Sequence, residues 1–198
     1  MIKAIIFDVG GVIYLGSPGY HSYVQKKLKL SSKEWKDLNK LSFRDKWGKG
    51  QKVNEGLSIA AKHLGIEKSK LRSLWAEALE KSSKLNKNLL LIVKRLRKNY
   101  KTAILSNQWA VSYKLHMNKN ILKNFDVSVF SHLVRTKKPE KKIYLIALKR
   151  LKLKPKECVF IDDFKLVLDP AKKLGMKTIL FRNNKQMIRD LRKLNIKI

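Results

Sequence analysis

The sequence predicts an α/β fold in which a doubly wound parallel sheet forms the core and an α-helical cap is inserted into it. Five short apolar segments rich in Ile, Val and Phe have the length and composition of buried strands. From the second segment onward they alternate with amphipathic helical patterns, which is typical of a parallel sheet covered on both faces. A long interval without a strand pattern follows the first segment and predicts the cap.

The expected strands and helices of the core follow one another at regular intervals. The strands are residues 3–7, 101–105, 126–130, 157–161 and 177–181. Apolar residues recur at helical spacing before the second strand, in Leu89, Ile92, Val93 and Leu96, and again between the third and fourth strands, in Ile143, Ile146, Ala147 and Leu151. Gly175 is the expected end of a further helix, because glycine readily adopts the left-handed conformation that terminates helices.

Residues 15–88 form the expected cap, because they contain several amphipathic helices and no convincing strand. Ser31 and Glu34 have the spacing of a capping box, while Asn54 can cap the next helix and Gly65 can end it. The apolar positions assigned to the interior of the cap are Trp35, Trp47, Leu71, Leu74, Trp75, Ala78 and Leu79.

The cap leaves the core directly after the first strand and returns before the second. It should therefore lie above the carboxyl ends of the strands, where ligands bind in open α/β sheets. We expect residues 1–14 and 89–198 to form the core and residues 15–88 to act as a lid.

The chain is strongly basic, with 46 Lys and Arg against 15 Asp and Glu and a formal net charge of +31. Such a charge attracts phosphates of any kind, from nucleic acids to small esters, and by itself identifies no partner. Because the basic residues are spread over many helices, we favour a solvated, lysine-rich surface over a dedicated nucleic-acid face.

Two features of the composition bear on the compartment. No apolar run reaches 18 residues, and Asp8 interrupts the N-terminal run, so the sequence predicts neither a membrane span nor a secretory signal. The single cysteine, Cys158, excludes an internal disulfide or a multi-cysteine zinc site, and we expect it to be buried. We therefore expect a cytoplasmic protein without membrane association.

Polar residues follow the expected strands where each one ends. In a parallel sheet these points lie along one edge, so the side chains should meet there. Two or three carboxylates at one edge repel one another unless a cation joins them, and an all-oxygen donor set suits Mg²⁺. A lysine and a hydroxyl beside them would hold a phosphoryl group. The residues are Asp8, Ser106, Asn107, Lys138 with Pro139 at the start of the following helix, Asp162 and Asp163.

At these residues the chain resembles the haloacid dehalogenase superfamily, particularly its phosphatase branch, in which a helical cap follows the first strand of a Rossmann-like core. The matching segments are "FDVGGVIY", "ILSN", "KKPEKKIYLIAL" and "VFIDDFKLVLDPAKKLGMKTILF". They occur in the order and spacing of the family and together cover the core almost from end to end.

The resemblance implies a role for each of these residues. Asp8 would be the nucleophile, which attacks phosphorus to give an aspartyl-phosphate that water then hydrolyses. Mg²⁺ would be held by Asp8, the carbonyl of Gly10, Asp162 and Asp163. Ser106 and Asn107 would bind the phosphoryl oxygens of a small phosphate ester, and Lys138 would bind them too while neutralising the charge that they share with Asp8.

The sequence departs from the family pattern at three positions. Gly10 stands where a second aspartate commonly protonates the leaving oxygen, a contribution of roughly 10² to 10⁴ in rate. We therefore expect slow hydrolysis of alkyl phosphates and relatively better hydrolysis of aryl, anomeric or acyl phosphates. Val167 stands where asparagine is usual, and Arg135 stands where a glycine before the lysine segment is common.

Two other functions stay open at this point. One is a catalytically weak or inactive member of the superfamily that binds phosphate or RNA through its basic surface. The other is a 2-haloacid dehalogenase, which attacks carbon without a metal. A metal-free site would gain nothing from Asp162 and Asp163 beside Asp8, so we place the dehalogenase last.

Overall fold

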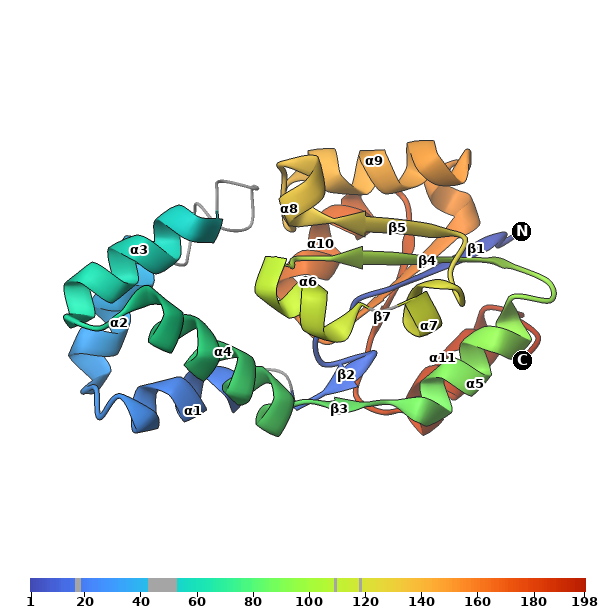
Figure 1. Ribbon diagram of the computed structural model, residues 1–198. Helices are drawn as coiled ribbons and strands as arrows, with labels where there is room; N and C mark the ends of the chain where they lie inside the picture. The colour runs from blue at the N-terminus through green and yellow to red at the C-terminus, as the bar shows by residue number, and fades with distance from the viewer. Residues whose placement is uncertain (17–18, 43–52, 109, 118) are drawn as a thin grey trace.

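The computed structural model describes residues 1–16, 19–42, 53–108, 110–117 and 119–198. Its centre is a five-stranded sheet in the order β5-β4-β1-β6-β7, in which every pair of neighbours is parallel (Figure 1). The strands are β1 (Ala4–Phe7), β4 (Lys101–Ser106), β5 (Val127–Phe130), β6 (Cys158–Asp162) and β7 (Lys177–Leu180). The predicted α/β fold is confirmed, and each predicted strand end lies within one residue of the observed end.

Helices cover both faces of the sheet because successive side chains of each strand point to opposite sides. Ile5 and Phe7 of β1 pack with α5 (Lys87–Leu96) and α11 (Asn184–Lys193) on one face. Ala4 and Ile6 pack on the other face with α9 (Lys141–Leu151) and α10 (Lys165–Lys173). Cys158 belongs to this second core and is fully buried, as predicted.

Shorter helices connect these layers. They are α6 (Ala110–His116), α7 (Lys119–Leu122), α8 (Ser131–Val134) and the 3₁₀ turn Pro155–Glu157. Among the helices that the structure describes, none combines the length and the apolar character needed to cross a bilayer.

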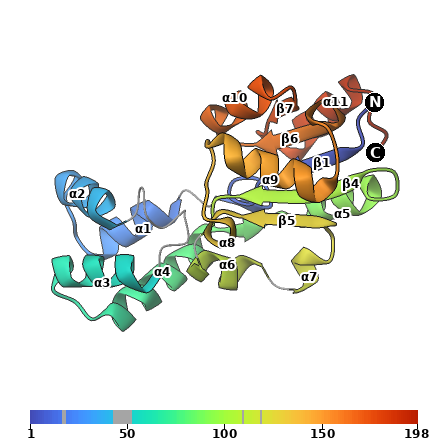
Figure 2. The same cartoon turned by 90° about the horizontal axis from the view of Figure 1, so that it is seen from above.

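Four helices between β1 and β4 pack around a small apolar core of their own. They are α1 (Gly19–Lys27), α2 (Ser32–Ser42), α3 (Val53–Leu64) and α4 (Lys68–Ser82). Trp75 lies buried at the centre of this core and Trp35 packs against it, whereas Trp47 lies outside the described residues. These helices extend beyond the carboxyl ends of β4 and β5 (Figures 1 and 2).

The predicted helix signals in this region had different outcomes. The Ser31 N–H donates to the Glu34 carboxylate at 2.8 Å, and the Glu34 N–H donates to the Ser31 hydroxyl at 3.2 Å, so the capping box is confirmed. Gly65, with φ +64°, follows the end of α3 as predicted. The prediction for Asn54 is wrong, because α3 begins at Val53 and Asn54 lies within its first turn.

A two-stranded antiparallel ribbon joins the four helices to the sheet. It consists of β2 (Tyr14–Leu15) and β3 (Lys84–Leu85), so the expectation of no strand between residues 15 and 88 is wrong. Each strand has only two residues, too few to produce an alternating pattern, and the pairing depends on segments far apart in the sequence.

His116 of α6 contacts both segments that join the four helices to the sheet. The Tyr14 hydroxyl donates to the carbonyl of His116 at 2.9 Å, and the two rings stack with centroids 4.1 Å apart. On the returning connection, the hydroxyl of Ser83 lies 2.9 Å from His116 Nε2. Burial lowers the pKa of His116 to about 4, so the imidazole is neutral near pH 7.

Arg135 provides a test of backbone strain next to the site. It follows α8 with φ +55°, a left-handed conformation that costs a side-chain-bearing residue about 1–2 kcal/mol. Because glycine loses more entropy on folding, we expect Arg135→Gly to raise the free energy of unfolding by no more than about 1 kcal/mol. Urea unfolding measures the change. Lys149→Gly within α9 is the control and should lower that free energy instead, and a loss of stability in both variants would contradict the prediction.

Candidate active site

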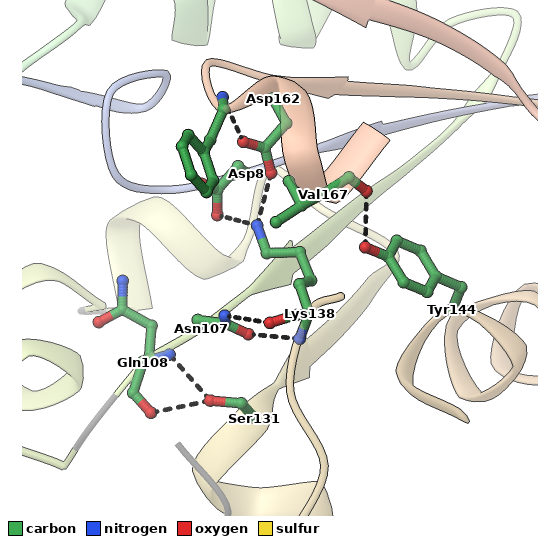
Figure 3. A network of polar contacts seen from close by, with 9 residues as sticks. Asp8, Asn107, Gln108, Ser131, Lys138, Tyr144, Asp162 and Val167 are labelled. Carbon is green, nitrogen blue, oxygen red and sulfur yellow. Dashed lines mark hydrogen bonds and ion pairs between the residues drawn. The ribbon is translucent and has the colours of Figure 1, made fainter. Parts of the chain in front are cut away.

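Lys138 joins two carboxylates from neighbouring strands of the sheet. Its Nζ lies 2.9 Å from Asp8 Oδ1 and 2.6 Å from Asp162 Oδ2 (Figure 3). The register of β1 and β6 pairs Phe7 with Ile161, so the next residue of each strand brings its carboxylate to the same edge. Asp8, Lys138 and Asp162 are only 8%, 4% and 1% exposed, so the ion pairs are shielded from water.

A third carboxylate completes the cluster. Oxygens of Asp8, Asp162 and Asp163 all lie within 4.8 Å of one another. Burial, followed by the charge of Asp8, raises the pKa of both Asp162 and Asp163. Burial alone would lower the pKa of Lys138, but the charges of Asp8 and Asp162 outweigh it and raise that pKa. Three acids against one lysine leave an excess of negative charge that a hard, oxygen-binding cation such as Mg²⁺ would fit.

The glycine pair after Asp8 turns the chain tightly against this cluster. Gly11 has φ +75°, and a side chain built on it would overlap the carboxylate of Asp163. Its N–H donates to the carbonyl of Tyr14 at 2.8 Å, while Gly10 forms an isolated bridge with Tyr14. The sequence assigned no role to Gly11, and the doublet of glycines was the only signal. The assignment of the Gly10 carbonyl to the metal stays a prediction.

Gly11 and Gly65 form a matched pair for testing this contact. Both have left-handed backbone, with φ +75° and +64°, but a side chain at Gly65 would meet nothing within 4 Å. Alanine at either position should cost about 1–2 kcal/mol of stability through backbone strain. We expect Gly11→Ala also to displace Asp163, lowering the phosphate release that the resemblance implies by more than about tenfold where Gly65→Ala keeps it. Urea unfolding and a phosphate-release assay measure both effects, and equal losses in the two variants would contradict the contact.

Ser106 and Asn107 lie where β4 ends, as expected, but their side chains differ in availability. Ser106 is a buried residue, and its hydroxyl makes no hydrogen bond to any residue that the structure describes. Asn107 Oδ1 accepts a hydrogen bond from the N–H of Lys138 at 2.8 Å, and Nδ2 donates to the carbonyl of Lys138 at 2.9 Å (Figure 3). The side chain of Asn107 therefore holds the backbone of Lys138.

The prediction that Lys138 and Pro139 open a helix is wrong. Residues 137–140 form a turn, in which the N–H of Glu140 donates to the carbonyl of Lys137 at 2.8 Å, and α9 begins only at Lys141. Asn107 Nδ2 donates to the carbonyl of Lys138, a group that a helix beginning at Lys138 would pair with an N–H one turn later.

Further polar residues support the site and were not found from the sequence. The N–H of Gln108 donates to the Ser131 hydroxyl at 3.1 Å, which in turn donates to the Gln108 carbonyl at 3.2 Å. Ser131 directly follows β5, so the rule that selected Asp8, a polar residue after a strand, could have found it. The Tyr144 hydroxyl donates at 2.6 Å to the carbonyl of Val167, whose side chain is buried in the core on that face (Figure 3).

Comparison with known proteins gives one family match. The model of the haloacid dehalogenase-like hydrolases matches residues 2–175. Rat bifunctional epoxide hydrolase 2 is 33% identical over 133 residues, which are 64% of this chain. The match spans only 24% of that longer relative.

Two further proteins are similar along most of the chain. The phosphorylated carbohydrates phosphatase of Thermotoga maritima is 27% identical over 189 residues, covering 90% of this chain and 84% of that protein. A HAD family enzyme of Bacteroides thetaiotaomicron, solved with magnesium and inorganic phosphate, superposes with a TM-score of 0.75 at 20% identity. That superposition covers 93% of this chain and 96% of the other, so the two proteins share the whole fold.

Proposed function

Because this chain belongs to the haloacid dehalogenase-like hydrolases, we propose that it is a Mg²⁺-dependent phosphatase that acts on small phosphate esters through Asp8. The observation that best supports the proposal is the placement of Lys138 Nζ between Asp8 and Asp162, with Asp163 alongside. That arrangement provides a carboxylate nucleophile, a buried cation and an oxygen-rich set of metal ligands. The T. maritima relative, whose name describes a phosphatase, agrees with this substrate class.

In the proposed reaction, an oxygen of Asp8 attacks phosphorus and the ester oxygen leaves with the electron pair of its bond to phosphorus. Water then attacks the phosphorus of the aspartyl-phosphate, releases phosphate and restores Asp8. Lys138 neutralises charge shared by Asp8 and the transferring group, and the free Ser106 hydroxyl donates to a phosphoryl oxygen. Asn107 is a positioning residue in this scheme, because its side chain holds Lys138.

The metal would be held by Asp8, the Gly10 carbonyl, Asp162 and Asp163. Asp162 has both oxygens engaged, one by Lys138 at 2.6 Å and the other by the N–H of Phe164 at 2.9 Å. Asp163 therefore offers the more available carboxylate. When bound, Mg²⁺ would reduce the repulsion between Asp8 and an anionic substrate.

Residues 15–88 act as the cap of this enzyme in our proposal, and residues 1–14 and 89–198 form its core. The four cap helices extend beyond the carboxyl ends of the strands that carry the site residues (Figure 1). The cap is therefore placed to select the alcohol portion of the ester.

The test is phosphate release from a panel of phosphate esters with Mg²⁺ and after removal of the metal with EDTA. We expect release that depends on Mg²⁺ and is greatest with aryl phosphates. Absence of phosphate release under all conditions would reject the proposal. Chloride release from chloroacetate in EDTA would instead identify a dehalogenase.

The absence of a second acid at position 10 leads to a separate prediction, which concerns how the rate depends on the leaving group. Because Gly10 carries no carboxyl group, it cannot give a proton to the leaving oxygen. The hydrolysis of alkyl esters is slowed most, since their leaving alkoxide is the most basic. We expect Gly10→Asp to raise kcat/KM for ethyl phosphate by up to roughly 10²-fold and to change that for p-nitrophenyl phosphate little. Steady-state kinetics with both esters measure the effect, and equal changes for the two would refute this account of Gly10.

A further inference from the structure

Helices α5 and α11 lie on the same face of the sheet (Figure 1). Residues of both helices line a groove. Its volume is about 1190 Å³, above the roughly 300–1,000 Å³ of small-molecule sites, and it is open to solvent. Its lining contains none of the residues assigned to the site around Asp8. The shape therefore suits a segment of a polymer that binds independently of catalysis.

The lining of the groove concentrates arginine in a chain whose basic residues are mostly lysine. The chain has nine arginines, and Arg95, Arg189 and Arg192 line this groove together with Lys185 and Lys193. No aspartate or glutamate is among the lining residues. The planar guanidinium group can bind a phosphate through two parallel hydrogen bonds, which an ammonium group cannot do.

Several of these cations are not neutralised by the protein. Asp190 pairs with Arg189 at 3.5 Å and with Lys193 at 3.8 Å. Within the part of the chain that the structure describes, no carboxylate lies within ion-pair distance of Arg95 or Arg192. Both are exposed in the last turns of their helices and remain available to an external anion.

The other end of the groove is also favourable for anions. Asn86 caps α5 and Asn183 caps α11 through their side chains. Asn86 and Asn184 exchange amide hydrogen bonds of 3.0 and 2.9 Å, which hold the two N-terminal ends side by side. Because a helix carries partial positive charge at its N-terminus, the groove is positive at this end as well as at Arg95 and Arg192.

The lining of the groove also contains apolar side chains. Leu91 is 60% exposed, Ile188 is half-buried and Ile92 is buried. The exposed amide of Asn88 also reaches the lining and can bond with a ribose 2′-hydroxyl. Each helix has ten residues and is about 15 Å long, which spans several successive phosphates of a single strand.

We propose that the groove between α5 and α11 binds single-stranded RNA. Arginines would contact the phosphates, the apolar lining residues would contact the bases and riboses, and the site would act independently of Asp8. Part of the +31 charge of the chain would then bind RNA directly in this groove. The lysines elsewhere on the surface would attract RNA at long range.

The test compares two double variants that change the net charge equally. Arg95→Glu with Arg192→Glu alters the last turns of the helices that form the groove. Lys149→Glu with Lys172→Glu alters the last turns of α9 and α10 on the opposite face, so it reproduces both the charge change and the unfavourable acid at a helix C-terminus. Fluorescence anisotropy of labelled oligo(U) is followed with each full-length protein over a series of salt concentrations.

We expect the groove variant to bind oligo(U) at least about tenfold more weakly than the control variant. The slope of log K against log salt should fall by roughly 0.7 for each phosphate that the variant no longer binds. Asp8→Asn should bind like the unmodified protein, so failure of the phosphatase proposal would leave this result unaffected. Equal weakening in both double variants would overturn the proposal in favour of diffuse attraction. Equal binding of oligo(dT), or competition by polyglutamate as effective as that of RNA, would overturn the assignment to RNA.

Discussion

Asp8→Asn is expected to lower kcat for aryl phosphate hydrolysis by roughly 10⁴-fold or more, because an amide cannot form the aspartyl-phosphate. The same substitution should not lower the free energy of unfolding. Three carboxylates lie within 4.8 Å of one another around one lysine, so removal of one negative charge relieves repulsion while Lys138 keeps Asp162 as its partner. A variant that loses activity but keeps its stability is expected where a residue contributes to catalysis and not to the stability of the fold.

Phosphate release and urea unfolding on the same preparation check both halves of this prediction. Asp169→Asn serves as the control, because Asp169 is an exposed carboxylate of α10 outside the cluster. It should retain activity. Phosphate release by Asp8→Asn close to that of the unmodified protein would remove Asp8 from the role of nucleophile.

Lys138→Met is expected to lower both activity and stability. Methionine fills much of the volume of the lysine stem but leaves Asp8 and Asp162 buried without their shared cation. Breaking a buried ion pair in this way costs about 3–5 kcal/mol in the free energy of unfolding. Loss of the charge beside the transferring phosphoryl group should lower kcat by roughly 10²- to 10³-fold.

Lys165→Met is the matched control for this variant. Lys165 lies two residues beyond Asp163 and is exposed, so its loss removes one positive charge near the site without unpairing a buried acid. Its free energy of unfolding should stay within about 0.5 kcal/mol of the unmodified protein. Added Mg²⁺ should recover part of the stability lost in Lys138→Met, since an ion that binds the folded state stabilises it. Equal stability of the two methionine variants without metal would show that the ion pairs contribute nothing.

The parts of this protein that a sequence can predict are those specified by short, local patterns. Each strand of the sheet is a compact apolar run, and Asp8, Ser106 and Asp162 directly follow or end such runs. Parallel topology then brings these positions to one edge without any knowledge of side-chain geometry. For the same reason the resemblance to the family could be read from four separated segments.

The parts that the sequence did not reveal depend on contacts between distant segments. The bonds from Asn107 hold the backbone of Lys138 in the turn before α9, and no pattern within the lysine segment encodes them. The need for glycine at position 11 arises from the carboxylate of Asp163, which lies on another strand connection. The pairing of β2 with β3 likewise joins residues that precede α1 to residues that follow α4.

The short ribbon of β2 and β3 has a consequence for how this enzyme fold can diversify. Because Leu15 pairs with Lys84, the chain departs from the sheet and rejoins it at adjoining points. With respect to the sheet, the segment between Leu15 and Lys84 is equivalent to one long hairpin loop. A different helical module could replace it without moving Asp8, Lys138 or Asp162. In the phosphatase that we propose, the choice of ester could therefore change while the reacting residues stay in place.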